Sequence, residues 1–182
     1  MNNIRVVDDI VHETENLFEN FYNDHDTAYI FTSDHGMSEI GNHGDGRELI
    51  HFQFSNLYQS NVDPDNTRTP LLAWGSGVRG PLPDVSHSSH DDYSKPWGLA
   101  HLYRRDLEQA DIAPLMAALI GIDWPVNSVG VLPDVDTTRP GYLNIDDYSK
   151  ARAALINAKV ILEQYRVKHG VFRIPVFMGE KV

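Results

Sequence analysis

The stretch Ala28-Tyr29-Ile30-Phe31-Thr32-Ser33-Asp34-His35-Gly36-Met37 decides how the rest of this sequence is interpreted. Its first five residues are a short apolar run rich in β-formers, typical of a strand buried on both faces of a parallel sheet. The polar residues follow directly, at the edge where open α/β sheets place their ligands. Asp34 and His35 offer a carboxylate oxygen and an imidazole nitrogen, a donor pair suited to Zn²⁺ or Mn²⁺, and Gly36 allows a sharp turn. The stretch therefore predicts a metal site beside a strand of an α/β fold.

A further candidate ligand lies in the glycine-rich segment Gly41-Asn42-His43-Gly44-Asp45-Gly46. Such a loop can fold back until His43 stands beside Asp34 and His35. The Asp45 carboxylate is then placed to orient the His43 ring, as carboxylates behind metal-bound histidines do. The alternative for each piece taken alone is a polar turn with exposed imidazoles.

The overall composition narrows the classes of function. The 182 residues contain 15 Lys and Arg against 26 Asp and Glu, a net charge of −11, which argues against nucleic acid or an anionic lipid surface as partner. Without cysteine, disulfide scaffolds, iron–sulfur sites and thiol catalysis are excluded, so any metal must be bound by histidine and carboxylates. No run of about 18 apolar residues occurs and the start is polar, so this chain alone is expected to be one soluble domain.

Hydrophobic periodicity places helices around the strand. We expect an amphipathic helix over residues 4–22, a second strand over 71–74, a mostly irregular segment over 78–102, and two later helices. Of the two later helices, one is capped by Asp111 and ends at Gly121, and the other begins near Asp146. The apolar faces predicted for the three helices are Val7, Ile10, Val11, Leu17, Phe18 and Phe21; then Ile112, Leu115, Met116 and Leu119; then Ala151, Ala154, Leu155, Ala158, Ile161, Leu162 and Tyr165.

Several other polar residues rank lower as site candidates. The cluster of His87, His90, Asp91 and Asp92 lies in a serine-rich loop, where a solvated turn is the favoured interpretation over a metal site. His101 and the arginines Arg79, Arg104 and Arg105 are expected at the surface, although an arginine there can meet a lipid phosphate. Trp74 and Trp124 are expected to pack in the core or at its rim.

Taken together, S-D-H-G-M at 33–37 and G-N-H-G-D-G at 41–46 resemble the metal-binding core of the alkaline phosphatase superfamily. The block at 109–133 and Ile161-Leu162-Glu163-Gln164-Tyr165 are similar to the luminal domain of the GPI ethanolamine phosphate transferases that act on the first mannose. The resemblance covers nearly all of 1–169. It implies a partial alkaline-phosphatase-like α/β fold, a doubly wound sheet with flanking helices that lacks its early strands. Residues 170–182 would be a tail or a returning strand.

The resemblance also implies an activity. A two-metal site, with two zinc ions in the complete domain, would transfer phosphoethanolamine from phosphatidylethanolamine to a GPI glycolipid intermediate through a threonine nucleophile. By the family pattern, Asp34 and His35 bind one metal and His43 binds the other. The domain would face the lumen of the endoplasmic reticulum, held at the membrane by segments absent from this chain.

The sequence departs from the family pattern at two places. The threonine nucleophile, an earlier metal-binding Asp and an Asp-x-x-x-His pair are missing, so no catalytic residue is assigned and the chain is expected to be an inactive fragment. Residues 47–62 have no counterpart and are expected to be an insertion; His51 within them is not a predicted ligand. Two alternatives remain, another metal-dependent phosphodiesterase of the superfamily and a non-catalytic truncated product that aggregates when expressed alone.

Overall fold

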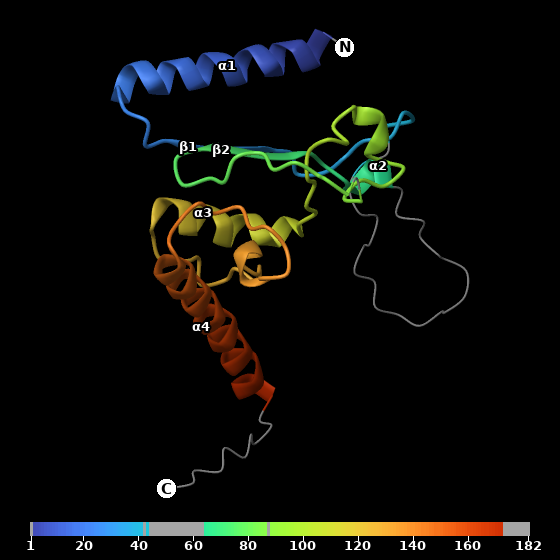
Figure 1. The fold of residues 1–182 in the computed structure, drawn as a ribbon. Coiled ribbons are helices and arrows are strands. Elements are labelled where there is room, and N and C mark those ends of the chain that lie inside the picture. Colours follow the sequence, from blue (N-terminus) through green and yellow to red (C-terminus); the bar gives the residue numbers. More distant parts are fainter. Residues whose placement is uncertain (1, 42, 44–63, 87, 173–182) are drawn as a thin grey trace, which may run out of the picture. The chain divides into compact units, whose positions relative to one another are not determined.

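The computed structural model describes residues 2–41, 43, 64–86 and 88–172. The expected insertion at 47–62, with Asp45, His51, His87 and residues 173–182, lies outside them. The elements follow the order α1 (Asn2–Tyr22), β1 (Ala28–Thr32), α2 (Pro64–Thr67), β2 (Leu71–Gly75), η1 (Lys95–Trp97), η2 (Gln109–Asp111), α3 (Ile112–Ile120), η3 (Pro133–Val135) and α4 (Asp147–Phe172) (Figure 1). They form two compact units, Tyr29–Trp74 and a unit made of Met1–Ala28 and Gly75–Val182.

Helix α1 confirms the helix predicted over residues 4–22, but its apolar face is not buried. None of its residues is classed as buried, and Leu17, Ile10 and Phe21 are more than half exposed. The aromatic rings at its C-terminal end contact one another, with Phe21 and Tyr22 centroids 4.9 Å apart. The amphipathic pattern is therefore present without the packing that such a pattern predicts.

Strands β1 and β2 are the two strands of the sheet among the described residues. The Ser76 amide donates to Thr27 O at the start of β1, whereas the Gly36 amide donates to Asn66 O beyond its end. This crossed order means that the strands run antiparallel. The prediction of a parallel neighbour is wrong for this pair, and all five residues of β1 are half-buried rather than covered on both faces. The doubly wound sheet stays a prediction, because two strands cannot test it.

Helix α3 occupies the predicted positions, between Asp111 and Gly121. Gly121 adopts the left-handed conformation (φ 67°) that a C-terminal cap requires, and its amide donates to Ala117 O. Of the predicted apolar face, Leu115 is fully buried, whereas Met116 is 49% exposed, so the prediction is wrong for Met116. Trp124, in the loop after the helix, is buried, which confirms its packing role.

The core of the larger unit gathers around residues that are distant in sequence. Leu115, Leu132 and Leu143 are fully buried, and the Val78–Leu143 bridge ties the start of the long loop to the segment before α4. A second bridge, Pro83–Leu102, closes that loop on itself. The segment over 78–102 is therefore irregular, as predicted, but it is fixed by backbone pairing at both ends.

Helix α4 begins where predicted but packs a different face. Asp146 accepts hydrogen bonds from the Ser149 amide (2.9 Å) and hydroxyl (2.6 Å), which confirms the cap. Ala153 and Asn157 are buried, whereas Leu155 is 56% and Leu162 64% exposed. The predicted face is wrong, since the buried stripe is centred on a small residue and an amide. The helix also continues to Phe172, so residues 170–172 are not part of a tail or strand.

No helix among the described residues combines the length and the apolar character needed to span a lipid bilayer.

Candidate functional site

The predicted metal-ligating motif follows β1 within the smaller unit. The Gly36 amide donates to Asn66 O (2.9 Å), and a Cβ at this position would lie 2.2 Å from Asp65 O. Only glycine permits this approach, so Gly36 fixes the motif against the backbone of α2. Asn66, which sequence reasoning missed, also holds a buried side-chain oxygen without a hydrogen-bond partner among the described residues.

The structure brings the two predicted histidines together. An isolated antiparallel bridge joins Met37 to His43, and it returns the glycine-rich loop to the end of the motif. The ring centroids of His35 and His43 lie 4.8 Å apart. The prediction that the loop folds back toward the motif is therefore confirmed for His43. Asp45, its predicted orienting partner, lies outside the described residues.

Both rings have the same tautomer, set by the local backbone. His35 Nδ1 donates to Gly36 O (2.8 Å), and His43 Nδ1 donates to Gly41 O (3.1 Å). A carbonyl only accepts, so each Nδ1 carries the proton and each neutral ring has its lone pair on Nε2. Metal-bound histidines are commonly held in this way, with the second nitrogen donating to a carbonyl.

Asp34 stands next to this lone pair. Its Oδ2 lies 3.5 Å from His35 Nε2, and its side chain is 82% exposed. The interaction with a positively charged His35, followed by backbone hydrogen bonding, lowers the pKa of Asp34. A carboxylate oxygen and Nε2 attract each other at this distance when Nε2 is protonated or when a metal cation lies between the two atoms. Two donors about 2.0–2.1 Å from one tetrahedral zinc ion would be separated by about 3.4 Å.

The donor types thus fit zinc, but the described residues form only part of a site. Among residues 2–41, 43, 64–86 and 88–172, no three His, Asp or Glu side chains converge on a point that could hold a metal ion. Within the described part of the chain, the histidine pair and Asp34 are therefore a set of oriented donors rather than a complete metal centre.

Within the predicted solvated turn, His90 is half-buried rather than solvated. His90 Nε2 donates to Leu102 O (2.8 Å), and its Nδ1 lies 3.1 Å from the hydroxyl of Ser94, which is fully buried. Asp91 also accepts from the Ser94 amide (3.0 Å). Asp91 and Asp92 are both exposed, as predicted, and Asp92 pairs with Lys95. His90 and Asp91 are framework residues of the loop.

Arg104 is the centre of that framework and not a surface arginine. Its side chain is only 13% exposed and donates to Asp91 (2.7 Å), to Asp106 (2.8 Å) and to Ser94 Oγ. The guanidinium also lies 5.7 Å from the Trp97 ring centroid. The hydrogen bond to Asp91, followed by that to Asp106, raises the pKa of this arginine. His101, by contrast, is exposed as predicted.

A buried carboxylate, Asp84, closes the same loop. Asp84 is 4% exposed and accepts hydrogen bonds from the Ser89 amide (2.8 Å), the Ser89 hydroxyl (2.6 Å) and the Ser86 hydroxyl (3.1 Å). These bonds, those of Ser89 first, hold the pKa of Asp84 far below its usual value. Asp84 is therefore a structural carboxylate.

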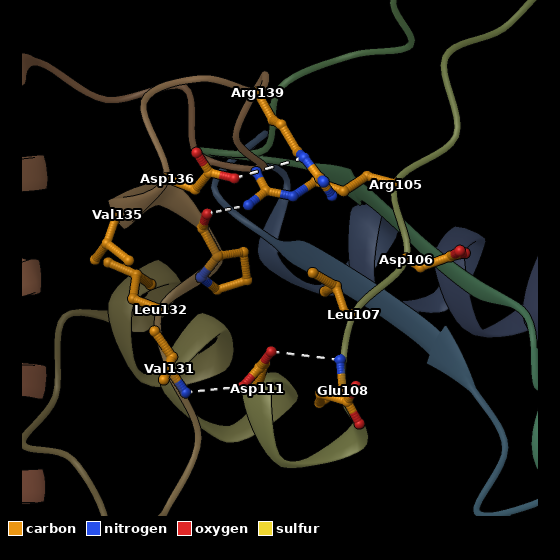
Figure 2. A pocket seen from close by; sticks show the side chains of 11 residues that line it. Arg105, Asp106, Leu107, Glu108, Asp111, Val131, Leu132, Val135, Asp136 and Arg139 are labelled. Carbon is orange, nitrogen blue, oxygen red and sulfur yellow. Dashed lines mark hydrogen bonds and ion pairs between the residues drawn. The ribbon is translucent and has the colours of Figure 1, made fainter. Parts of the chain in front are cut away.

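A cavity of about 230 Å³ opens in the larger unit (Figure 2). Arg105, Asp136 and Arg139 gather at one end, and Glu108 and Asp111 lie at the other. Its remaining lining residues are Asp106, Leu107, Val131, Leu132, Pro133 and Val135. Sequence reasoning did not identify this cavity, because its two walls are separated by about twenty residues and neither carries a recognisable motif.

The charged groups of the cavity are held by the backbone. Arg105 donates to Pro140 O (2.7 Å) and to Pro133 O, so it is half-buried rather than free at the surface. Asp111 occupies the predicted cap position of α3, but its carboxylate does not cap that helix. It accepts instead from Val131 N (2.8 Å) and Glu108 N (3.3 Å), which ties the two walls together.

The chain is similar to proteins named GPI ethanolamine phosphate transferase 1. It is 49% identical over 170 residues to the protein of Chaetomium globosum, and 48% identical over 170 residues to that of Neurospora crassa. The Schizosaccharomyces pombe protein is 43% identical over 167 residues. These matches cover 91–92% of this chain but only 15–16% of the relatives. No family model and no solved structure matches. Nearly the whole chain thus corresponds to one part of proteins named as transferases.

Proposed function

We propose that this chain is part of a transferase that moves phosphoethanolamine from phosphatidylethanolamine to the first mannose of a GPI glycolipid intermediate. The observation that carries the proposal is the pair of adjacent histidines with fixed tautomers after β1. The similarity to proteins named as GPI ethanolamine phosphate transferases supplies the class of reaction.

Asp34 and His35 would hold one zinc ion, and His43 would contribute to a second. When bound, the ions supply Lewis-acid stabilisation of the phosphoryl oxygens, as in other two-metal phosphoryl transfer sites. We propose that the remaining ligands and the threonine nucleophile belong to other parts of the complete transferase.

The residues of this chain prepare the ligands. The carbonyls of Gly36 and Gly41 hold the protons on Nδ1, so both Nε2 atoms can bind a cation without a tautomer change. The Asp34 carboxyl, whose pKa lies below its ordinary acidic value, contributes a negative charge to the same donor set. Because Gly36 anchors the motif to Asn66, the donors are held by backbone contacts and not by side-chain packing alone.

The proposed setting follows from the substrates. Phosphatidylethanolamine and a GPI intermediate are both membrane lipids, so we propose that the complete protein is attached to a membrane. The resemblance implies that this is the endoplasmic reticulum membrane, with this part in the lumen. Nucleic acid is not a proposed partner, since the chain has a net charge of −11.

The test replaces each histidine in the full-length protein. We expect His35→Ala and His43→Ala to lower transfer of phosphoethanolamine to the first mannose at least a hundredfold, and to reduce bound zinc measured by elemental analysis. His101→Ala, at an exposed histidine outside the motif, is the matched control and should change neither quantity. Full activity and unchanged zinc content in both histidine variants would exclude the proposed site.

The same assay separates transfer from hydrolysis. A transferase places the labelled phosphoethanolamine on the glycolipid, whereas a phosphodiesterase of the same superfamily releases it as a free compound. Release without transfer would leave the metal site intact but would replace the proposed reaction with hydrolysis.

A further inference from the structure

The cavity between Arg105 and Asp111 has separated charges that fit a zwitterion. At one end, Arg105 donates to two neutral carbonyl oxygens, which position the guanidinium without neutralising it. Arg139 lies 3.6 Å from Asp136, so this end contains two cations and one anion. Asp106, which also lines the cavity, is paired with Arg104, so the net charge of this end is positive.

The opposite end is negative. Glu108 and Asp111 form a reciprocal capping box, in which each carboxylate accepts from the backbone amide of the other residue. Asp111 also accepts from Val131 N. These partners are neutral amides, and neither carboxylate forms an ion pair within the described part of the chain. The two anions therefore keep their full charge beside the cavity.

Figure 2 shows that the two groups of charges lie at opposite ends, with Leu132, Val135 and Leu107 between them. The volume of about 230 Å³ is below the 300–1,000 Å³ that is usual for drug-sized ligands. It therefore suits a small headgroup and not a glycan or an acyl chain. A ligand of this size that satisfies both ends must carry an anion and a cation joined by a short linker.

We infer that this cavity binds a phosphoethanolamine group, with the phosphate at Arg105 and Arg139 and the ammonium at Glu108 and Asp111. The inference rests on the proposed function for the choice among small zwitterions. The group belongs either to phosphatidylethanolamine or to a glycan that already carries it. In both cases none of the residues that line the site comes from the 33–43 segment.

The binding test uses the full chain in a neutral maltoside detergent and titrates O-phosphoethanolamine by calorimetry, with a chelator present. We expect saturable binding that is at least tenfold tighter than that of inorganic phosphate or ethanolamine alone. Arg139→Gln and Glu108→Gln should each weaken it about tenfold or more. The amide oxygen of the substituted glutamine can still accept the capping hydrogen bond, so Glu108→Gln removes charge while leaving the turn intact. Circular dichroism checks that both variants fold.

Matched controls come from the exposed pair on α4. Arg166→Gln and Glu163→Gln remove the same charges far along the chain from the cavity and should leave binding unchanged. Equal affinity for phosphate alone, or no effect of Glu108→Gln in a folded chain, would overturn the inference. Loss of binding in His35→Ala would also overturn it, since binding would then belong to the metal site. A chain that binds as expected while the full-length protein shows no transfer would refute the proposed function alone.

Two further arms identify the source of the group. If the donor lipid is the natural ligand, the chain should bind to phosphatidylcholine vesicles that contain phosphatidylethanolamine. Free O-phosphoethanolamine should then compete with the vesicles for the chain. Binding of the free compound without retention on vesicles supports the modified glycan. Equal binding to vesicles of pure phosphatidylcholine would overturn the inference, because binding would then not require the phosphoethanolamine headgroup.

Discussion

Asn157→Leu should be among the most destabilising single changes in the larger unit, although the replacement adds an apolar side chain to a helix. Asn157 is 3% exposed, and its Oδ1 accepts from Leu132 N (2.9 Å) while its Nδ2 donates to Gly130 O (2.9 Å). Leucine leaves both backbone groups buried without a partner. Each unsatisfied group costs about 1–3 kcal/mol, so we expect a loss of about 2–6 kcal/mol of unfolding free energy.

Urea unfolding at low protein concentration, followed by tryptophan fluorescence, measures this loss, because the buried Trp124 reports on the same core. Leu155→Ala, on the exposed face of the same helix, is the control and should change the unfolding free energy by no more than about 0.5 kcal/mol. The reasoning is refuted if Asn157→Leu lies within that range, or if Leu155→Ala is the more destabilising variant. The second result would mean that α4 packs the face predicted from the sequence.

Four further outcomes are expected. Arg104→Gln leaves two carboxylates and a buried hydroxyl without their cation and should lower the unfolding free energy by about 1–3 kcal/mol in urea unfolding. Gly130→Ala places a Cβ 2.0 Å from Ala110 O and should cost about 1–3 kcal/mol, whereas Gly80→Ala, with open space, should cost under about 0.5 kcal/mol. The folded-state pKa of Asp84 is depressed, so its stabilisation is complete above the unfolded-state pKa near 3.8 and is lost as pH falls below it; Asp84→Asn should flatten that acid dependence in pH-dependent unfolding. The exposed apolar faces of α1 and α4 should make the isolated chain aggregate in light scattering, and a monomeric chain with a cooperative transition would contradict this.

Local signals in the sequence predicted the elements well. Residue periodicity predicts α1, β1 and α4 to within a few residues. The ends of helices are predicted correctly where the capping group and its hydrogen-bond partner are close in sequence. Asp146 and Gly121 are such positions, because their partners lie within four residues of them. The return of His43 to the motif was predicted on the same basis, from glycines that permit a tight turn.

The errors concern residues whose partners are distant. Hydrophobicity predicts that Leu155 and Leu162 are buried and that Asn157 is exposed. Asn157 is buried instead, because the backbone at 130–132 supplies one hydrogen-bond donor and one acceptor for its side chain. Asp111 lies at the expected cap position, but its carboxylate accepts a hydrogen bond from the Val131 amide, twenty residues away, and does not cap the helix. Arg104 is buried for the same reason, since its carboxylate partners come from both sides of the loop. Such pairings depend on tertiary structure, which residue types alone do not specify.

The difference between local and long-range interactions also explains why the histidine pair can be recognised in a short chain. The carbonyls that fix the tautomers of His35 and His43 lie one and two residues away, so the orientation of the donor atoms is encoded locally. Convergence of enough ligands to bind a metal tightly requires side chains from separate elements, and the described residues do not bring three together. We therefore expect the zinc affinity of this chain to be weak and that of the full-length protein to be strong, with His35→Ala lowering both. Equal affinity in the two proteins would show that the ligand set is complete within this chain.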